Sequence, residues 1–120
     1  MLKTERLILR QWTDDDFAPF SNISRDSKVM EFYPSQLTEE ESNNMANRVQ
    51  SLVQDKGWGF WAVELPYSEK FIGFVGLHAP KNTLPFSPCV EIGWRLSKAH
   101  WGKGYATEAA KESLKFAFTI

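Results

Sequence analysis

The order of hydrophobic and polar positions at the start of the chain predicts a strand followed by a short helix. A hydrophobic run bounded by charged residues at 7–12 is typical of a strand. Thr13 and Asp16 then stand three positions apart and resemble a capping box, with Asp in place of the usual Glu or Gln. A short helix is therefore expected through residues 17–20.

A second, longer helix is expected in the middle of the chain. Thr38 and Glu41 form a full capping box, which predicts a helix start at this point. Apolar residues then recur at helical spacing, at Met45, Val49, Leu52 and Val53. Gly57 is a typical C-terminal stop, so the helix should end close to it.

The second half of the chain returns to strand-like patterns. Strands are expected at 59–65 and 71–77, joined by a hairpin turn at 66–69. The segment 79–88 contains three prolines and predicts an irregular loop. A fourth strand is expected at 89–97, and a helix follows it. The predicted order is one strand, two helices, three strands and a final helix, which is an α/β fold.

Residues 101–106, Trp-Gly-Lys-Gly-Tyr-Ala, join the fourth strand to the final helix. The first N–H groups of a helix have no partner inside it, and the helix dipole adds positive potential there. A glycine turn at this place can therefore hold a phosphate or pyrophosphate, because its backbone can approach the anion closely. The order of Gly102, Lys103 and Gly104 fits neither the dinucleotide-binding fingerprint nor the Walker pattern. A plain tight connection between strand and helix stays open as the alternative.

Composition and charge narrow the class of protein. The chain has 120 residues, enough for one domain, and a formal net charge of −1, which gives no electrostatic footprint for nucleic acid or an acidic membrane. Cys89 is the single cysteine, so no internal disulfide can form, and a small buried side chain is expected there. His78 and His100 have no companion ligands close in sequence, so no metal site is predicted. No apolar run is long enough to cross a bilayer, and a cytoplasmic location is expected.

Three ordered segments carry a resemblance to a known family. They are Glu91–Leu96 with His100–Ala109, the opening Leu2–Arg10 with Asp14–Phe17, and the middle Trp61–Val63 through Phe71–Leu77. Together they closely resemble the GNAT acetyltransferases, particularly the RimJ/RimL-like branch. The resemblance implies an α/β GNAT fold, with a mixed, mostly antiparallel sheet flanked by helices. It implies a single domain over residues 1–120 that corresponds to the N-terminal two-thirds of the family fold and stops after the helix that follows the fourth strand.

The resemblance also implies a cofactor, acetyl-CoA, and no metal. In the family, a loop of the pattern Gln/Arg-x-x-Gly-x-Gly/Ala binds the pyrophosphate. Gly104 and Ala106 fill its last two conserved places, and Trp101 stands where Gln or Arg is usual. Backbone groups on the fourth strand pair with the pantetheine, whereas the Trp94 side chain is expected in the core. The expected cofactor-binding set is Trp94, Arg95, Leu96, Trp101, Gly102, Lys103, Gly104, Tyr105, Ala106 and Thr107.

Glu91 is the candidate catalytic residue. It shares one face of the expected fourth strand with Gly93 and Arg95. Apolar neighbours on a buried strand would raise the pKa of its carboxyl, which suits a general base. The alternative is a structural ion pair with Arg95. The residue that protonates the departing thiolate in the family lies beyond Ile120 and is not assigned.

Glu31, Phe32 and Tyr33 are the candidate acceptor-binding residues, because an aromatic rim with an acid would suit a cationic amine. A hydrophobic staple between helices is the alternative role for these aromatics. The resulting prediction is an N-acetyltransferase that acts on a primary amine, best a protein N-terminal α-amine. A truncated, inactive coenzyme A-binding or assembly module and a generic anion-binding domain stay open. The open edge of the fourth strand predicts pairing with a second copy or strand exchange.

Overall fold

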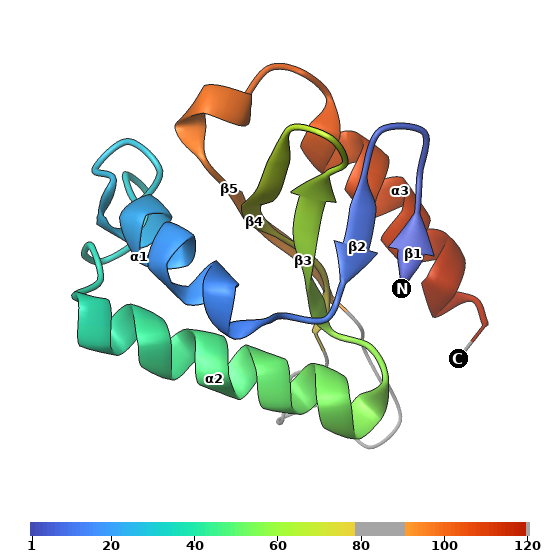
Figure 1. Ribbon diagram of the computed structural model, residues 1–120, viewed down its shortest axis with the longest axis horizontal. Helices are drawn as coiled ribbons and strands as arrows, with labels where there is room; N and C mark the ends of the chain where they lie inside the picture. Colours follow the sequence, from blue (N-terminus) through green and yellow to red (C-terminus); the bar gives the residue numbers. More distant parts are fainter. Residues whose placement is uncertain (79–90, 120) are drawn as a thin grey trace.

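The computed structural model describes residues 1–78 and 91–119, and for Glu91 it describes the backbone alone. Figure 1 shows a sheet with helices on both of its faces. The elements are β1 (Leu2–Lys3), β2 (Ile8–Arg10), α1 (Phe17–Arg25), α2 (Glu39–Lys56), β3 (Phe60–Leu65), β4 (Glu69–His78), β5 (Glu91–Leu96) and α3 (Tyr105–Ala117). Short 3₁₀ turns at Asp14–Asp16 and Lys98–His100 precede α1 and the glycine turn.

The five strands form one sheet in the order β1-β2-β3-β4-β5, and all of its described pairings are antiparallel. Leu9 lies opposite Val63, and Gly73 lies opposite Leu96. Strands that follow one another in sequence are therefore neighbours in space, as short connections favour. In the described part of the sheet, β5 forms one edge, and this edge later becomes a wall of the candidate site.

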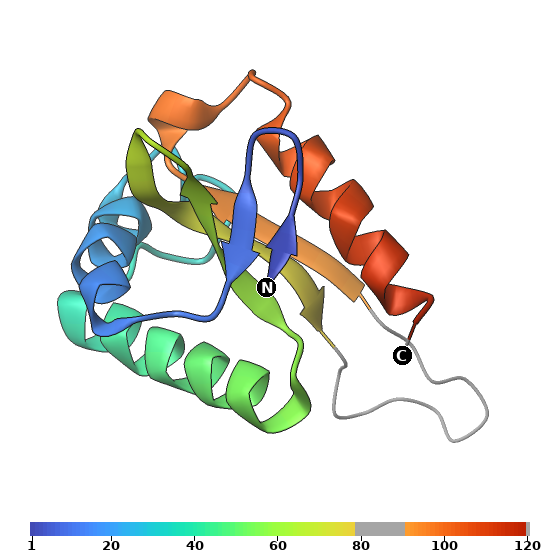
Figure 2. The ribbon, with the colours of Figure 1, turned by 45° about the vertical axis from the view of Figure 1, so that its right-hand side comes forward.

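The two faces of the sheet carry separate hydrophobic clusters, because successive side chains of a strand point to opposite faces. Helices α1 and α2 cover one face, and α3 covers the other (Figure 2). Under α1 and α2, Trp12 packs edge-to-face on Phe20 with ring centroids 5.2 Å apart, and its Nε1 donates to the Phe60 carbonyl at 2.9 Å. On the α3 side, Trp61 packs edge-to-face on Phe116 at 5.3 Å. The fold therefore has one core for each layer of helices.

A buried ion pair ties β2 to the turn before α1. Asp16 is 1% exposed and accepts two hydrogen bonds from the Arg10 guanidinium, at 2.7 and 2.9 Å. Arg10 also donates to Glu64 on β3 at 2.8 Å, so its charge has two carboxylate partners. The hydrogen bonding of Arg10 to the Asp16 carboxylate is the main reason that the pKa of Arg10 is raised. The expected bond of the first capping box also forms, since the Thr13 N–H donates to Asp16 at 2.8 Å.

The ends of α2 agree with the sequence prediction. The Thr38 hydroxyl accepts from the Glu41 N–H at 3.1 Å, and the Glu41 carboxylate accepts from the Thr38 N–H at 2.9 Å. Gly57 follows the last residue with φ +79°, a left-handed conformation that closes the helix. No helix within residues 1–78 and 91–119 combines the length and the apolar surface that crossing a bilayer requires.

The strand predictions need one addition and several changes of boundary. β1 was not expected, because two residues are too short to produce a hydrophobic period, and its pairing partner β2 supplies the reason that it forms. The predicted strands at 59–65 and 71–77 correspond to β3 and β4, and β4 is longer than predicted, at Glu69–His78. The expected loop at 79–88 and Cys89 lie outside the described residues.

Candidate functional site

The glycine turn before α3 has the backbone conformation that an anion cradle needs. Gly102 and Gly104 have φ values of +75° and +79°, in the left-handed region that favours glycine. Gly104 is the residue that caps α3, and its carbonyl accepts the first helical hydrogen bond from the Glu108 N–H at 3.0 Å. The N–H groups of the first helical turn, at 105–107, have no acceptor inside the helix. They and the helix dipole therefore present positive potential at the end of the turn.

The open edge of β5 runs beside this turn. The Ser97 N–H donates to the Ile72 carbonyl on β4 at 2.9 Å. Because hydrogen-bonded and non-bonded pairs alternate in an antiparallel ladder, Arg95 bonds to β4 whereas Trp94 and Leu96 direct their backbone groups to the open edge. The Trp101 indole N–H accordingly reaches the Leu96 carbonyl at 3.0 Å. The edge therefore offers backbone donors and acceptors to an extended ligand.

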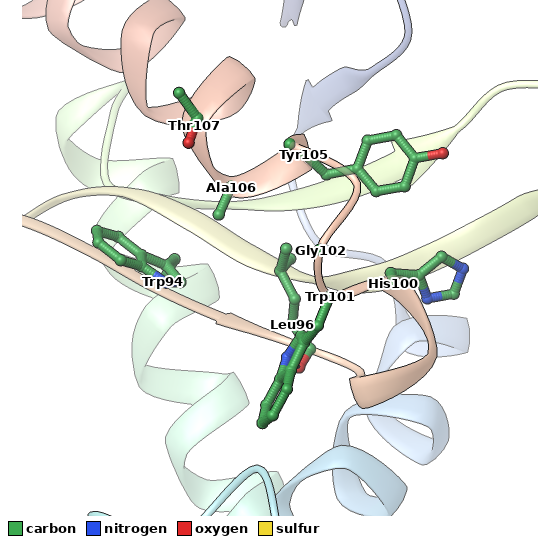
Figure 3. A pocket seen from close by; sticks show the side chains of 9 residues that line it. Trp94, Leu96, His100, Trp101, Gly102, Tyr105, Ala106 and Thr107 are labelled. Carbon is green, nitrogen blue, oxygen red and sulfur yellow. The ribbon is translucent and has the colours of Figure 1, made fainter.

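A cavity of about 340 Å³ lies between β5 and the start of α3 (Figure 3). It is called the turn cavity below, and its lining is Trp94, Leu96, His100, Trp101, Gly102, Gly104, Tyr105, Ala106 and Thr107. The structure thus brings together every predicted cofactor-binding residue except Arg95 and Lys103, and it adds His100. Figure 3 shows Trp94 on β5 opposite Ala106 at the start of α3.

Trp94 corrects one sequence expectation. Its side chain was expected in the core, but it is 53% exposed. On this edge strand, Leu96 belongs to the core cluster that includes Ala109 of α3 and is 4% exposed, whereas the Trp94 side chain lies outside that cluster. The indole instead forms part of the wall of the turn cavity.

Contacts from the N-terminal segment, called the N-terminal clasp below, hold the glycine turn in place. The clasp consists of Thr4, Arg6 and Glu108: the Glu108 carboxylate accepts from the Thr4 hydroxyl, from the Arg6 N–H at 2.9 Å and from Arg6 Nε at 2.6 Å. Arg6 Nη1 also donates to the Lys103 carbonyl at 2.9 Å, and its guanidinium lies 4.6 Å from the centre of the Tyr105 ring. The clasp therefore fixes both the turn and the first turn of α3 to the segment between β1 and β2.

The clasp also sets the charge state of Glu108. Burial raises the pKa of this carboxyl, but the hydrogen bonds from Thr4 and Arg6 and the Arg6 charge outweigh it, so the pKa is lowered overall. Sequence reasoning missed the clasp because its members are about a hundred residues apart. The only available signal was that all three fall within the segments that carry the family resemblance.

His100 sits at the far side of the turn, with its ring 6.2 Å from Tyr105 (Figure 3). Its Nδ1 hydrogen-bonds with the Ser97 hydroxyl. Burial lowers the pKa of His100 below its usual value, the Lys103 charge lowers it further, and Glu69 acts against both. The lowered pKa favours the uncharged imidazole.

A second cavity of about 510 Å³ adjoins the turn cavity. It is called the rim cavity, and its lining is Lys28, Val29, Glu31, Phe32, Tyr33, Ile92, Gly93, Trp94, Arg95, Leu96 and Trp101. The three predicted acceptor-binding residues thus line one cavity. Phe32 is 94% exposed, which contradicts the alternative role of a hydrophobic staple for this side chain. The rim cavity and the turn cavity share the wall formed by Trp94, Leu96 and Trp101.

Arg95 faces away from the turn cavity and is 7% exposed. Its guanidinium lies 4.5 Å from the centre of the Tyr33 ring, and within 6 Å of the Phe20 and Phe74 rings. Nη1 donates to the Ser24 hydroxyl at 3.3 Å. Sequence reasoning grouped Arg95 with the cofactor-binding backbone and did not foresee this aromatic surrounding, which α1, the segment after it and β4 supply.

Glu91 is described by its backbone alone, opposite His78 on β4. Its side chain lies outside the described part, so its role as general base and its alternative role as an ion-pair partner of Arg95 both stay predictions. Within residues 1–78 and 91–119, no three His, Cys, Asp or Glu side chains gather as a metal site would require.

Comparisons with known proteins agree with one another. The family model described as "Acetyltransferase (GNAT) domain" matches residues 6–120. A relative from Bacillus subtilis (strain 168), named "Uncharacterized N-acetyltransferase YoaA", is 32% identical over 125 residues, which cover 99% of this chain and 67% of the relative.

Solved structures with the same fold extend the comparison. A GNAT-family acetyltransferase from Bacillus anthracis superposes with a TM-score of 0.78 and 29% identity, over 98% of this chain and 65% of its own. RimL, a ribosomal L7/L12 α-N-protein acetyltransferase in complex with coenzyme A, superposes with a TM-score of 0.70 over 96% of this chain and 64% of its own. At 15% identity, this second likeness shows the fold alone. The chain spans about two-thirds of the length of each of these proteins.

Proposed function

The chain belongs to the GNAT acetyltransferase family, and on that premise we propose that it transfers an acetyl group from acetyl-CoA to a primary amine. The observation that carries the proposal is the pair of left-handed glycines, Gly102 and Gly104, at the start of α3 beside the open edge of β5. The glycine turn suits a pyrophosphate, and the open edge of β5 suits an extended chain with amide groups.

The described residues fit acetyl-CoA at the turn cavity. The N–H groups at 105–107 would hold the pyrophosphate, and the left-handed glycines let the backbone approach it without a Cβ in the way. Backbone groups of Trp94 and Leu96 would pair with the pantetheine as an added strand does. Acetyl-CoA supplies the activated acetyl group as a thioester. The side chains of the chain itself bind and orient it, and the turn cavity adjoins the rim cavity at Trp94, Leu96 and Trp101.

The acceptor would occupy the rim cavity, which adjoins the turn cavity at their shared lining residues. A protein N-terminal α-amine, the acceptor expected from the resemblance to the RimJ/RimL-like branch, remains part of the proposal. Glu91 remains the proposed base, taking the proton that the amine loses on acetylation. The inactive-module alternative has no observation in its favour within the described residues.

Isothermal titration of the chain with acetyl-CoA, with ATP as the anion control, tests the cofactor part of the proposal. Selective binding of acetyl-CoA is expected, because only acetyl-CoA can use both the turn and the edge of β5. Equal affinity for ATP would reduce the site to a generic anion cradle and would contradict the proposal. A thiol-release assay with a panel of primary amines then tests acetyl transfer.

Gly104→Ala provides the sharper test of the turn, with Gly57→Ala as its matched control. Both glycines have φ +79°, so both variants carry the same left-handed strain, about 1 kcal/mol. Gly57 lies at the end of α2, away from the turn cavity, and a Cβ there meets nothing within 4 Å. At Gly104 the Cβ would lie 3.3 Å from Arg6 Nη2. We expect Gly104→Ala to weaken acetyl-CoA binding roughly tenfold, because the turn must keep its strained left-handed conformation when acetyl-CoA is bound. We expect Gly57→Ala to leave acetyl-CoA binding unchanged.

A further inference from the structure

Arg95 is a buried cation that the described residues leave incompletely satisfied. It is 7% exposed, and its Nε atom has no hydrogen-bond partner among the described residues. Its polar contacts are the Ser24 hydroxyl at 3.3 Å and the Met45 sulfur at 3.7 Å, both made by Nη1. Neither contact carries a negative charge.

This arrangement is costly for a structural arginine. A buried charge normally has an ionic partner as well as hydrogen bonds, because removal from water is otherwise expensive. The ion pairs among the described side chains join Arg6 to Glu108 and Arg10 to Asp16 and Glu64, and none includes Arg95. The rings of Tyr33, Phe20 and Phe74 stabilise the guanidinium in part, but they do not replace a hydrogen-bond acceptor.

The position of Arg95 explains where its partner would come from. Arg95 lines the rim cavity, in which Lys28 supplies a second cation and Glu31 supplies a carboxylate. The same cavity reaches Trp94, Leu96 and Trp101, the wall that it shares with the turn cavity. A ligand in the rim cavity would therefore meet the cation at one place and the proposed acetyl donor where the two cavities adjoin.

We propose that Arg95 binds a carboxylate of the acyl acceptor, so that the acceptor is a primary amine that also bears a carboxylate. This inference rests on the proposed function and narrows its substrate class. The planar guanidinium matches the two oxygens of a carboxylate, which a lysine at this place would not do. Glu31 gives the rim cavity an opposite charge for the ammonium group of the same molecule. A zwitterionic amine thus suits the cavity better than a simple cationic amine.

The test compares acids with their amides. β-Alanine, 4-aminobutyrate and 6-aminohexanoate are titrated against the chain, free and with coenzyme A present, beside the three corresponding carboxamides. Three chain lengths are used so that the distance between the carboxylate and the amine differs among the ligands. At least one acid is expected to bind about tenfold more tightly than its amide, from a charge-assisted hydrogen bond in a buried place. Equal binding of every acid and amide, or no binding of either, overturns the proposal.

Arg95→Met and the control Lys28→Met assign the preference to one side chain. Arg95→Met replaces the cation by an apolar side chain, so we expect the acid-to-amide ratio to fall close to one. We also expect an unchanged or raised melting temperature, because an uncompensated buried charge is removed. Lys28→Met removes the exposed cation of the same cavity and should keep the ratio within about threefold, as a solvated charge contributes little.

Two results would identify a different role for Arg95. A lower melting temperature for Arg95→Met with an unchanged acid-to-amide ratio would make it a structural residue. A tenfold loss of acetyl-CoA affinity with an unchanged ratio would make its partner part of the cofactor. Acetyl-CoA binding by the unaltered chain is measured separately. Its absence would count against the proposed function, and the acid and amide titrations on the free chain would still decide this inference.

Discussion

The Glu108→Gln substitution tests whether the N-terminal clasp stabilises the fold. The change keeps the size of the side chain and removes its charge and one acceptor oxygen. In the structure, one carboxylate oxygen accepts from Arg6 Nε, and the other accepts from the Arg6 N–H and the Thr4 hydroxyl. A glutamine can keep only one of these two acceptors, and its amide N–H₂ must face donors at the other place.

The expected loss follows from the exposure of the partners. The Arg6 side chain is 44% exposed, so the ion pair itself contributes at most about 1 kcal/mol. The Glu108 side chain is only 19% exposed, and the lost acceptor leaves a donor without its bond, which costs about 1 kcal/mol more. Together, about 1.5–2 kcal/mol of unfolding free energy is lost. For a chain of this size, that lowers the melting temperature by roughly 6 °C.

Thermal unfolding followed by circular dichroism at several pH values measures both the size and the origin of the effect. The pKa of Glu108 is lowered in the folded state, so its ionised form stabilises the fold. The unaltered chain therefore has its full advantage in unfolding free energy over Glu108→Gln above about pH 4.5, the ordinary pKa of the group. The advantage is lost as the pH falls through the lower pKa of the folded state, where both chains carry a neutral side chain.

Glu112→Gln is the matched control, one turn further along α3. Glu112 makes no ion pair within the described residues, so this change should move the melting temperature by less than about 2 °C, as typical surface substitutions do. The reasoning would be refuted by equal losses for the two variants. It would also be refuted if the loss for Glu108→Gln stayed constant down to pH 3.

Three further substitutions test the core and the sheet. Trp12→Ala should cost about 4 kcal/mol in urea unfolding, since it empties a fully buried site. Asp16→Asn should lower the free energy of unfolding by about 3 kcal/mol, because Arg10 loses its buried ionic partner and keeps only the ion pair with Glu64. A loss below 1 kcal/mol would mean that Glu64 alone compensates the Arg10 charge. Gly73→Ala should prevent native folding, as seen by circular dichroism, because the Cβ would lie 2.0 Å from the Arg95 carbonyl oxygen. A cooperative native-like melt for Gly73→Ala would show that β4 and β5 can separate.

Local signals predicted most of the fold correctly. The bounds of α2 follow from two features that act within a few residues, the Thr38–Glu41 capping box and the left-handed Gly57. The glycine turn was recognisable for the same reason, since its conformation and the free N–H groups of α3 are local properties. The family resemblance then gave these elements their order in space, and the fold comparison confirms it.

Features that depend on distant residues could not be predicted. The exposure of Trp94 depends on its place at the sheet edge beside the start of α3, and the burial of Arg95 depends on α1, the segment after it and β4. Neither effect produces a recognisable pattern of apolar and polar positions in the sequence. The same holds for Arg6, whose partner is 102 residues away.

The separation of Arg6 and Glu108 has a consequence for how the chain acquires its structure during synthesis. Synthesis runs from the N-terminus, so β1 to β4 are made before Glu108 has been added. Contacts between such distant residues also form slowly, because a long loop must close first. Any strand pairing that forms before Glu108 is added forms while the segment between β1 and β2 still lacks its anchor. The turn that would receive the acetyl donor is one of the last parts of the described fold to be completed in the growing chain.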